Sequence, residues 1–232
     1  MQITPELSTF SILLIGFVLG LQHAIEADHL AAVSTIVSEK KNVWTASLVG
    51  GLWGIGHTIS IFVVAVAVVG LKLQIPTWLE SRLEAIVGVM LVILGVNALS
   101  KLLRKSNLHI HSHEHDGRLH THIHAHEDET AADSHHYFSP RSVVVGMVHG
   151  LAGSAALMFL VLPAIKSPVL ALGYILIFGV GSIGGMMAMS FLIGLPFHFT
   201  ANRFEAFNKT IRLCAGVFSL GLGITIIAER LG

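Results

Sequence analysis

Cysteine and charged residues are scarce in this sequence. The charged residues Asp, Glu, Lys and Arg make up 12% of its 232 residues, and hydrophobic residues make up 53%. Soluble domains carry about 25% charged residues, so a lipid bilayer is the expected environment of this chain. The single cysteine, Cys214, excludes an internal disulfide, a cysteine-rich metal cage and a two-thiol redox relay.

Motifs of ATPases, metalloproteases and nucleic-acid-binding proteins are also missing. The chain has no G-x-x-x-x-G-K-S/T phosphate loop, and it has no H-E-x-x-H motif, because Ala24 follows His23. Acidic and basic residues both number 14, with no basic stripe or aromatic platform for nucleic acid. The N-terminus lacks the basic start of a signal peptide, which predicts that the first apolar run is retained. We therefore expect neither an enzyme nor a nucleic-acid-binding protein.

Six apolar segments are long enough to cross a bilayer, which takes about 20 mostly apolar residues. They cover roughly residues 8–37, 45–71, 79–102, 141–164, 169–195 and 210–230. The predicted fold class is an all-α integral membrane protein with six transmembrane helices. Ten of the 14 Lys and Arg residues follow the first, third or fifth segment, which predicts that this side is cytoplasmic. Both termini are then expected outside the plasma (inner) membrane.

The two halves of the sequence resemble each other. GLQHAIEAD (20–28) matches GMVHGLAGS (146–154), GIGHTI (54–59) matches GVGSIG (179–184), and Gly88 and Gly95 align with Gly216 and Gly223. Chance alignment of glycine-rich apolar segments is the alternative. A repeated three-helix unit has opposite orientations in one membrane, the 3+3 inverted-repeat plan of many secondary transporters. The domains predicted are a first repeat in 1–103, a histidine-rich loop in 104–140 and a second repeat in 141–232.

Small residues four positions apart occur in several of the expected helices. Such pairs let helix backbones approach closely inside a membrane. The pairs are Gly16/Gly20, Gly50/Gly54, Gly146/Gly150 and Gly181/Gly185. They predict helix packing and carry no chemistry.

Four ionisable residues, His23, Glu26, Asp28 and His29, lie within the first apolar segment. Each costs several kcal/mol in a bilayer unless it is paired, hydrated or bound to metal. A straight helix over 8–37 would be about 45 Å long, against a hydrocarbon core of about 30 Å, so tilt or a break is required. Either the helix unwinds between Ala24 and Ala27 so that these side chains converge, or they serve different roles. An interfacial helix end is a simpler interpretation, but the apolar run resumes after His29.

His57 lies deep in the second apolar segment, within GLWGIGHTIS. A lone buried histidine usually hydrogen-bonds a backbone carbonyl, but the cluster in the first segment makes a ligand role more attractive. His23, Asp28, His29 and His57 together would supply three nitrogens and one carboxylate, which suits late first-row divalent metals. Glu26 is expected either to ligate the metal or to orient a histidine.

At these residues the sequence resembles the nickel/cobalt transporter family. HAIEADH (23–29) matches the family's histidine, four residues, aspartate, histidine signature, and GHTIS (56–60) is similar to its second signature. The resemblance implies that His23, Asp28, His29 and His57 recognise the metal. The chain departs from the longer members, which have about eight helices, aspartate in place of Glu26, and an acidic third signature.

The second half looks like the short six-helix relatives labelled urease accessory proteins, which are also assigned to nickel supply. HGLAGSAALM (149–158) carries this likeness. Ser154 and Ala155 stand where the repeat would have the aspartate and the second histidine. His149 is therefore expected to be a secondary ligand or a core histidine, and His198 an interfacial residue.

Histidines alternate along the segment between the third and fourth apolar runs. Residues 109–136 hold ten of them together with six carboxylates, namely His109, His111, His113, His115, His120, His122, His124, His126, His135 and His136. The segment is too polar to be expected to fold alone, and alternating histidines bind divalent metals with little geometric selectivity. We predict a disordered cytoplasmic loop that buffers metal ions.

Together these features predict a nickel or cobalt transporter acting in uptake, with Ni²⁺ or Co²⁺ as the transported ion and Zn²⁺ compatible with the same ligands. Export, with the histidine-rich loop collecting ions, is one alternative. A transmembrane b-type haem protein is another. The implied partners are the divalent ion, the bilayer, and a metallochaperone or a urease or hydrogenase maturation protein.

Overall fold

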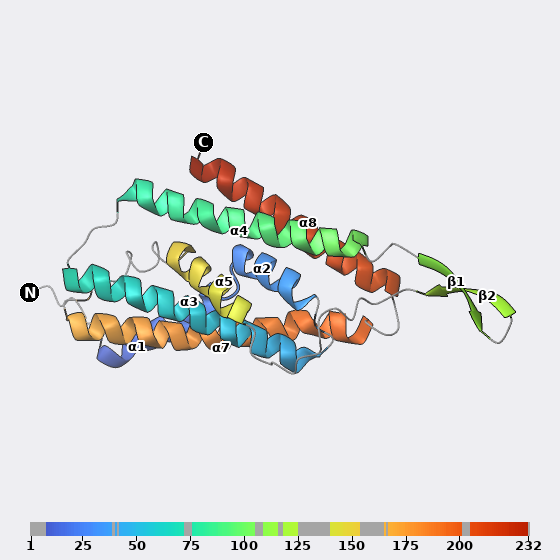
Figure 1. Cartoon of the computed structure of the whole chain (residues 1–232). Coiled ribbons are helices and arrows are strands. Elements are labelled where there is room, and N and C mark those ends of the chain that lie inside the picture. Colours follow the sequence, from blue (N-terminus) through green and yellow to red (C-terminus); the bar gives the residue numbers. More distant parts are fainter. Residues whose placement is uncertain are drawn as a thin grey trace, which may run out of the picture.

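The computed structural model describes residues 8–38, 40, 42–71, 76–104, 109–115, 118–124, 140–153, 165, 167–200 and 205–231. Within these ranges the helices are α1 (Thr9–His23), α2 (Ala27–Val37), α3 (Val43–Leu71), α4 (Thr77–Arg104), α5 (Pro140–Gly153), α7 (Pro168–Thr200) and α8 (Glu205–Leu231). Two strands, β1 (His109–His115) and β2 (Arg118–His124), complete the elements. Figure 1 shows the helices as one elongated bundle, with the two strands beyond one of its ends.

Four of the described helices, α3, α4, α7 and α8, are long and apolar enough to cross a membrane. The bent pair of α1 and α2 brings the number to five if it counts as one span. Large apolar side chains such as Phe10, Val63 and Ile93 are exposed on the bundle, as expected for a surface in contact with lipid. The structure thus confirms a helical multi-pass membrane protein. The sixth predicted span stays a prediction, because only α5 is described and residues 154–164 lie outside the described ranges.

The first apolar segment is broken within its polar cluster. The helix α1 ends at His23, and Glu26, with an extended backbone (φ −65°, ψ 152°), precedes the new helix α2, which is inclined by 54° to α1. The backbone N–H of Glu26 donates to the carbonyl of His23 across the break. This is the first of the two alternatives that the sequence left open, namely unwinding between Ala24 and Ala27.

Close backbone contacts at glycines hold the central helices together. The helix α1 packs on α7 and α5 packs on α3, while α3 and α7 lie side by side. A methyl group added at Gly20 would collide with the backbone carbonyl of Phe178 on α7, and one added at Gly146 would collide with that of Trp53 on α3. These contacts confirm the predicted packing role of the small-residue pairs.

The helices α4 and α8 form the other layer of the bundle (Figure 1). The Cβ position of Gly88 faces the backbone of Gly223, and that of Gly95 faces the backbone of Gly216. Ser219 Oγ donates a hydrogen bond of 2.9 Å to the carbonyl of Leu91 between these two contacts. The two helices therefore run antiparallel, and glycines of one helix contact glycines of the other.

The alternating histidine stretches, 109–115 and 118–124, form a two-stranded antiparallel hairpin. The sequence had predicted a disordered loop here. In its register His109 lies opposite His124, His111 opposite His122, and His113 opposite His120. Alternation with a period of two is the pattern of a strand, and pairing the two stretches satisfies the backbone groups on their facing edges. His126, His135 and His136 lie outside the described residues.

Candidate metal centre

The break in the first apolar segment gathers four histidines in the interior of the bundle. His23 ends α1, His29 lies in the first turn of α2, His57 lies in the middle of α3, and His149 lies in α5. The exposed fraction of His23 is 1%, and that of the other three is 0%. Burying four imidazoles at the junction of helices is costly unless their nitrogens find partners, so the cluster requires a chemical explanation.

The first group comprises His23, His29 and His57. One ring nitrogen of each lies within 4.8 Å of the others. The Nε2 atoms of His23 and His57 are 3.1 Å apart. Metal–nitrogen bonds of about 2.0–2.1 Å in a tetrahedral site place two ligating nitrogens roughly 3.3 Å apart. A divalent ion could therefore be held after small shifts of these rings.

The second group comprises Asp28, His29 and His149, and its ligand atoms also lie within 4.8 Å of one another. Asp28 Oδ1 lies 3.0 Å from His29 Nδ1, and Asp28 Oδ2 lies 3.0 Å from His149 Nε2. The backbone N–H of His29 also donates to Asp28 Oδ1, at 2.8 Å. The carboxylate thus joins a histidine of the first half of the chain to one of the second half.

A carboxylate oxygen lies beside Nδ1 of two histidines of the first group, as a hydrogen-bond partner of His29 and at ion-pair distance from His23. Glu26 Oε1 lies 2.9 Å from His23 Nδ1, and Asp28 Oδ1 lies 3.0 Å from His29 Nδ1. When Nδ1 donates its proton to a carboxylate, Nε2 keeps its lone pair for a metal. Among the described residues His29 Nε2 has no hydrogen-bond partner, as expected for such a ligand atom.

The structure brings the candidate residues together differently from the predicted set of four ligands. His23, His29 and His57 form one group, whereas Asp28 belongs to the other group, with His149. Glu26 belongs to neither group, although its Oε1 lies 2.9 Å from His23 Nδ1, and its role stays a prediction. His198 belongs to neither group and has an exposed side chain near the end of α7.

Two further buried residues were not expected from the sequence, namely Trp53, which packs on the cluster, and Ser182 on α7. Trp53 stacks on His29 with ring centroids 5.5 Å apart and lies 5.4 Å from His149. Ser182 is fully buried in α7, and its hydroxyl has no partner among the described residues. Trp53 lies about one helical turn before His57, and Ser182 aligns with His57 in the repeat, so both signals were present in the sequence.

The bundle and the buried cluster indicate the class of protein. It is a multi-pass membrane protein with a histidine and carboxylate site suited to a divalent transition metal. The chain is 36% identical over 219 residues to the urease accessory protein UreH of Bacillus sp. (strain TB-90), covering 94% of this chain and 91% of that relative. It therefore belongs to the UreH family of urease accessory proteins. Members of this family are accessory proteins and not enzymes.

A second relative has a different name and a longer chain. The sequence is 22% identical over 221 residues to the chloroplast protein FOR GROWTH AND FERTILITY 2 of Arabidopsis thaliana, covering 93% of this chain and 55% of that relative. The chain thus spans about half the length of this second relative. No protein-family model and no solved structure matches the sequence.

Proposed function

We propose that this protein carries nickel ions across the plasma membrane, and that the first group, His23, His29 and His57, binds the ion during passage. The observation that carries the proposal is the convergence of three buried ring nitrogens within 4.8 Å, and two of these rings have a carboxylate oxygen 2.9 or 3.0 Å from Nδ1. Imidazole ligands suit nickel, cobalt and zinc alike. Membership in a urease accessory family, together with the likeness to nickel/cobalt transporters, favours nickel.

His29 is the residue that both groups share, and this suggests a path for the ion. Its Nδ1 atom contacts Asp28 of the second group, and its Nε2 atom has no hydrogen-bond partner among the described residues and is left to bind an ion in the first group. An ion bound at His23 and His57 could pass to Asp28 and His149 by exchanging ligands around one ring. Such a step needs only rotations of neighbouring side chains, and it carries the ion from the first half of the chain toward the second.

The 3+3 inverted repeat belongs to the same proposal. The alignment pairs Gly88 with Gly216 and Gly95 with Gly223. In the structure Gly88 faces Gly223 and Gly95 faces Gly216, which is the crossed pattern that a two-fold axis between two repeats would produce. A rocking motion of one repeat against the other could then open the cluster to each side in turn.

The histidine hairpin is proposed as a cytoplasmic reservoir for the same ions. Its register places histidine opposite histidine at three positions, which concentrates imidazole groups within a short stretch of backbone. The site inside the membrane is built from helices, whereas an isolated two-stranded hairpin is only marginally stable, so the selectivity of the hairpin among divalent ions is expected to be low.

The sequence left two alternatives to nickel uptake, namely metal export and a b-type haem protein. Export uses the same ligands and differs from uptake only in direction. The haem alternative fits the geometry less well. The Nε2 atoms of His23 and His57 are 3.1 Å apart, which leaves no space for a porphyrin plane between them.

Radioactive nickel accumulation in cells tests the proposal. Cells expressing the wild type are expected to accumulate more nickel than cells without the protein, and His29→Ala should abolish this gain while reaching the membrane in equal amounts. His198→Ala is the matched control, because this exposed histidine belongs to neither group, and it should accumulate nickel normally. Unchanged uptake by His29→Ala would sink the proposal. Lower accumulation in the wild type than in empty cells would replace uptake by export.

A further inference from the structure

A second polar site lies apart from the histidine cluster, in a cavity of about 200 Å³ between α2, α3, α4 and α5. Three basic side chains line it, namely Lys40 after the end of α2, Lys101 near the end of α4, and Arg141 in the first turn of α5. No acidic residue is among the described side chains that line this cavity. The described part of its lining is therefore basic.

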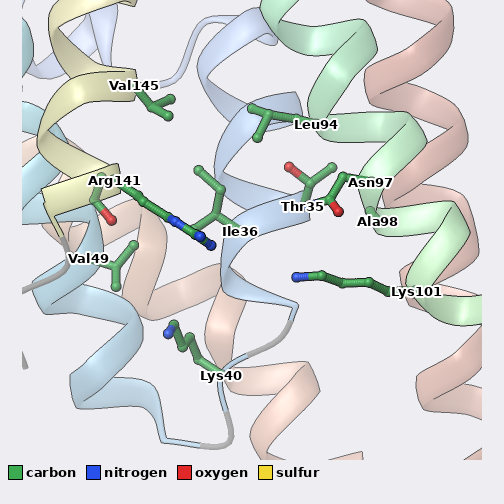
Figure 2. Close-up of a pocket in the computed structure, with 11 residues that line it drawn as sticks. Thr35, Ile36, Lys40, Val49, Leu94, Asn97, Ala98, Lys101, Arg141 and Val145 are labelled. Carbon is green, nitrogen blue, oxygen red and sulfur yellow. The ribbon is translucent and has the colours of Figure 1, made fainter. Parts of the chain in front are cut away.

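Figure 2 shows how these side chains lie. The guanidinium group of Arg141 and the ammonium group of Lys101 extend toward each other from opposite sides of the cavity, and Lys40 lies on the adjoining side. An anion in this cavity would be attracted by all three basic groups. Three different elements supply these charges, so the arrangement comes from the tertiary fold and not from one run of basic residues.

The cavity joins the interior of the bundle to its surface. Thr35 and Ser142, which line it, are 3% and 4% exposed, whereas the side chains of Lys101 and Arg141 are exposed. The backbone N–H groups of the first turn of α5 also lie at this end of that helix, and helix N-termini favour anions. A bound anion would thus meet basic groups at the opening of the cavity and neutral polar groups deeper inside.

We propose that this cavity binds one phosphate group, either the headgroup phosphate of an anionic lipid or free inorganic phosphate. Its volume lies below the roughly 300–1,000 Å³ of pockets for drug-sized ligands, which favours a small anion or a headgroup over a nucleotide. Basic pockets between transmembrane helices commonly receive lipid headgroups. Because α2 and α4 belong to the first half of the chain and α5 to the second, the anion links the two halves.

The test uses the purified full-length protein and two double variants that each remove two positive charges. Lys40→Gln/Arg141→Gln alters the cavity, and Arg82→Gln/Lys209→Gln is the matched control, since both of its residues are exposed and outside the cavity lining. Native mass spectrometry with phosphatidylglycerol and phosphatidylcholine measures lipid binding. Calorimetry with sodium phosphate, in nanodiscs of phosphatidylcholine, measures binding of the free anion.

A headgroup site predicts that the wild type and the control variant prefer phosphatidylglycerol, and that the cavity variant binds it about 30-fold more weakly, at about 1 kcal/mol for each basic residue. A site for free phosphate predicts calorimetric binding that the cavity variant alone loses. If both double variants weaken lipid binding equally, or neither does, and phosphate does not bind, the proposal is wrong. Should the cavity variant aggregate, Lys101→Gln replaces it, with an expected loss of about fivefold.

Discussion

His149 Nε2 lies 3.0 Å from Asp28 Oδ2, although 121 residues separate the two in the chain. The contact joins α5 to the first turn of α2, and so links the second half of the chain to the helix break in the first half. Asp28 simultaneously accepts from the ring and the backbone of His29. The carboxylate of Asp28 therefore contacts both His29, which the two groups share, and His149, which belongs to the second group alone.

The pair predicts coupled effects of substitution. In Asp28→Asn the amide keeps one acceptor oxygen, so it cannot accept hydrogen bonds from His29 and His149 with separate oxygens. We expect Asp28→Asn and His149→Ala each to reduce nickel transport, and the double variant to lose no more than Asp28→Asn alone, because contacting residues are not additive. Initial rates of nickel uptake at equal membrane levels provide the measurement. Losses that simply multiply would show that the contact does not act in transport.

Glu26 predicts a graded series. Glu26→Ala leaves His23 Nδ1 without its carboxylate and should weaken nickel binding by about 10–100-fold, the usual effect of removing a partner behind a ligating histidine. Glu26→Gln retains a hydrogen-bond acceptor and should recover most of the affinity. Titration of purified protein with nickel, with Glu229→Ala as an exposed control, checks this order. Equal affinity of Glu26→Ala and the wild type would remove the orienting role.

Helix packing at Gly146 predicts a loss of stability. A methyl group there meets the backbone of Trp53, so Gly146→Ala must push α5 away from α3 and should cost about 1–3 kcal/mol or more. Gly184→Ala, on the open surface of α7 where nothing lies within 4 Å, should be neutral or stabilise the helix by up to about 1 kcal/mol. Thermal unfolding in detergent compares the two. Similar melting temperatures would contradict the close approach.

The contact between α4 and α8 predicts a cross-link. In a Cys214→Ser background, Leu91→Cys/Ser219→Cys puts one thiol on each of two buried positions in neighbouring turns of α4 and α8, so oxidation should join the two helices. Ile93→Cys/Ser219→Cys is the control, because the side chain of Ile93 is exposed whereas that of Leu91 is fully buried. Mobility on non-reducing gels after cleavage between the helices reports the bond. A higher yield in the control would require a different register of α4 against α8.

Removing the histidine hairpin should distinguish retention of nickel in the cell from its transport across the membrane. A chain without residues 109–136 should take up nickel at nearly the wild-type initial rate but lose it faster when external nickel is withdrawn, because the site in the bundle is intact and the reservoir is gone. A chain with the histidines of this segment replaced by serine is the matched control for its length. Complete inactivity of both would show that the segment takes part in transport itself.

Local sequence features determined the class of the protein and the kind of chemistry it carries. Scarce charge and long apolar runs indicate a bilayer, and the ionisable residues from His23 to His29 within an overlong run indicated either a tilted helix or a break at that place. The structure confirms this break, because it depends on residues that are neighbours in the chain. The small-residue pairs likewise predicted close packing, though not which helices meet.

Only the tertiary structure decided how the ligands are grouped. The sequence placed Asp28 with His23 and His57, whereas in the fold Asp28 faces His149 and leaves three imidazoles together. The inclination of α2 and the approach of α5 to α3 produce this grouping, and both arise from contacts between residues far apart in the chain. The cavity lined by Lys40, Lys101 and Arg141 has the same origin, because these basic residues are far apart in the chain and no local pattern connects them.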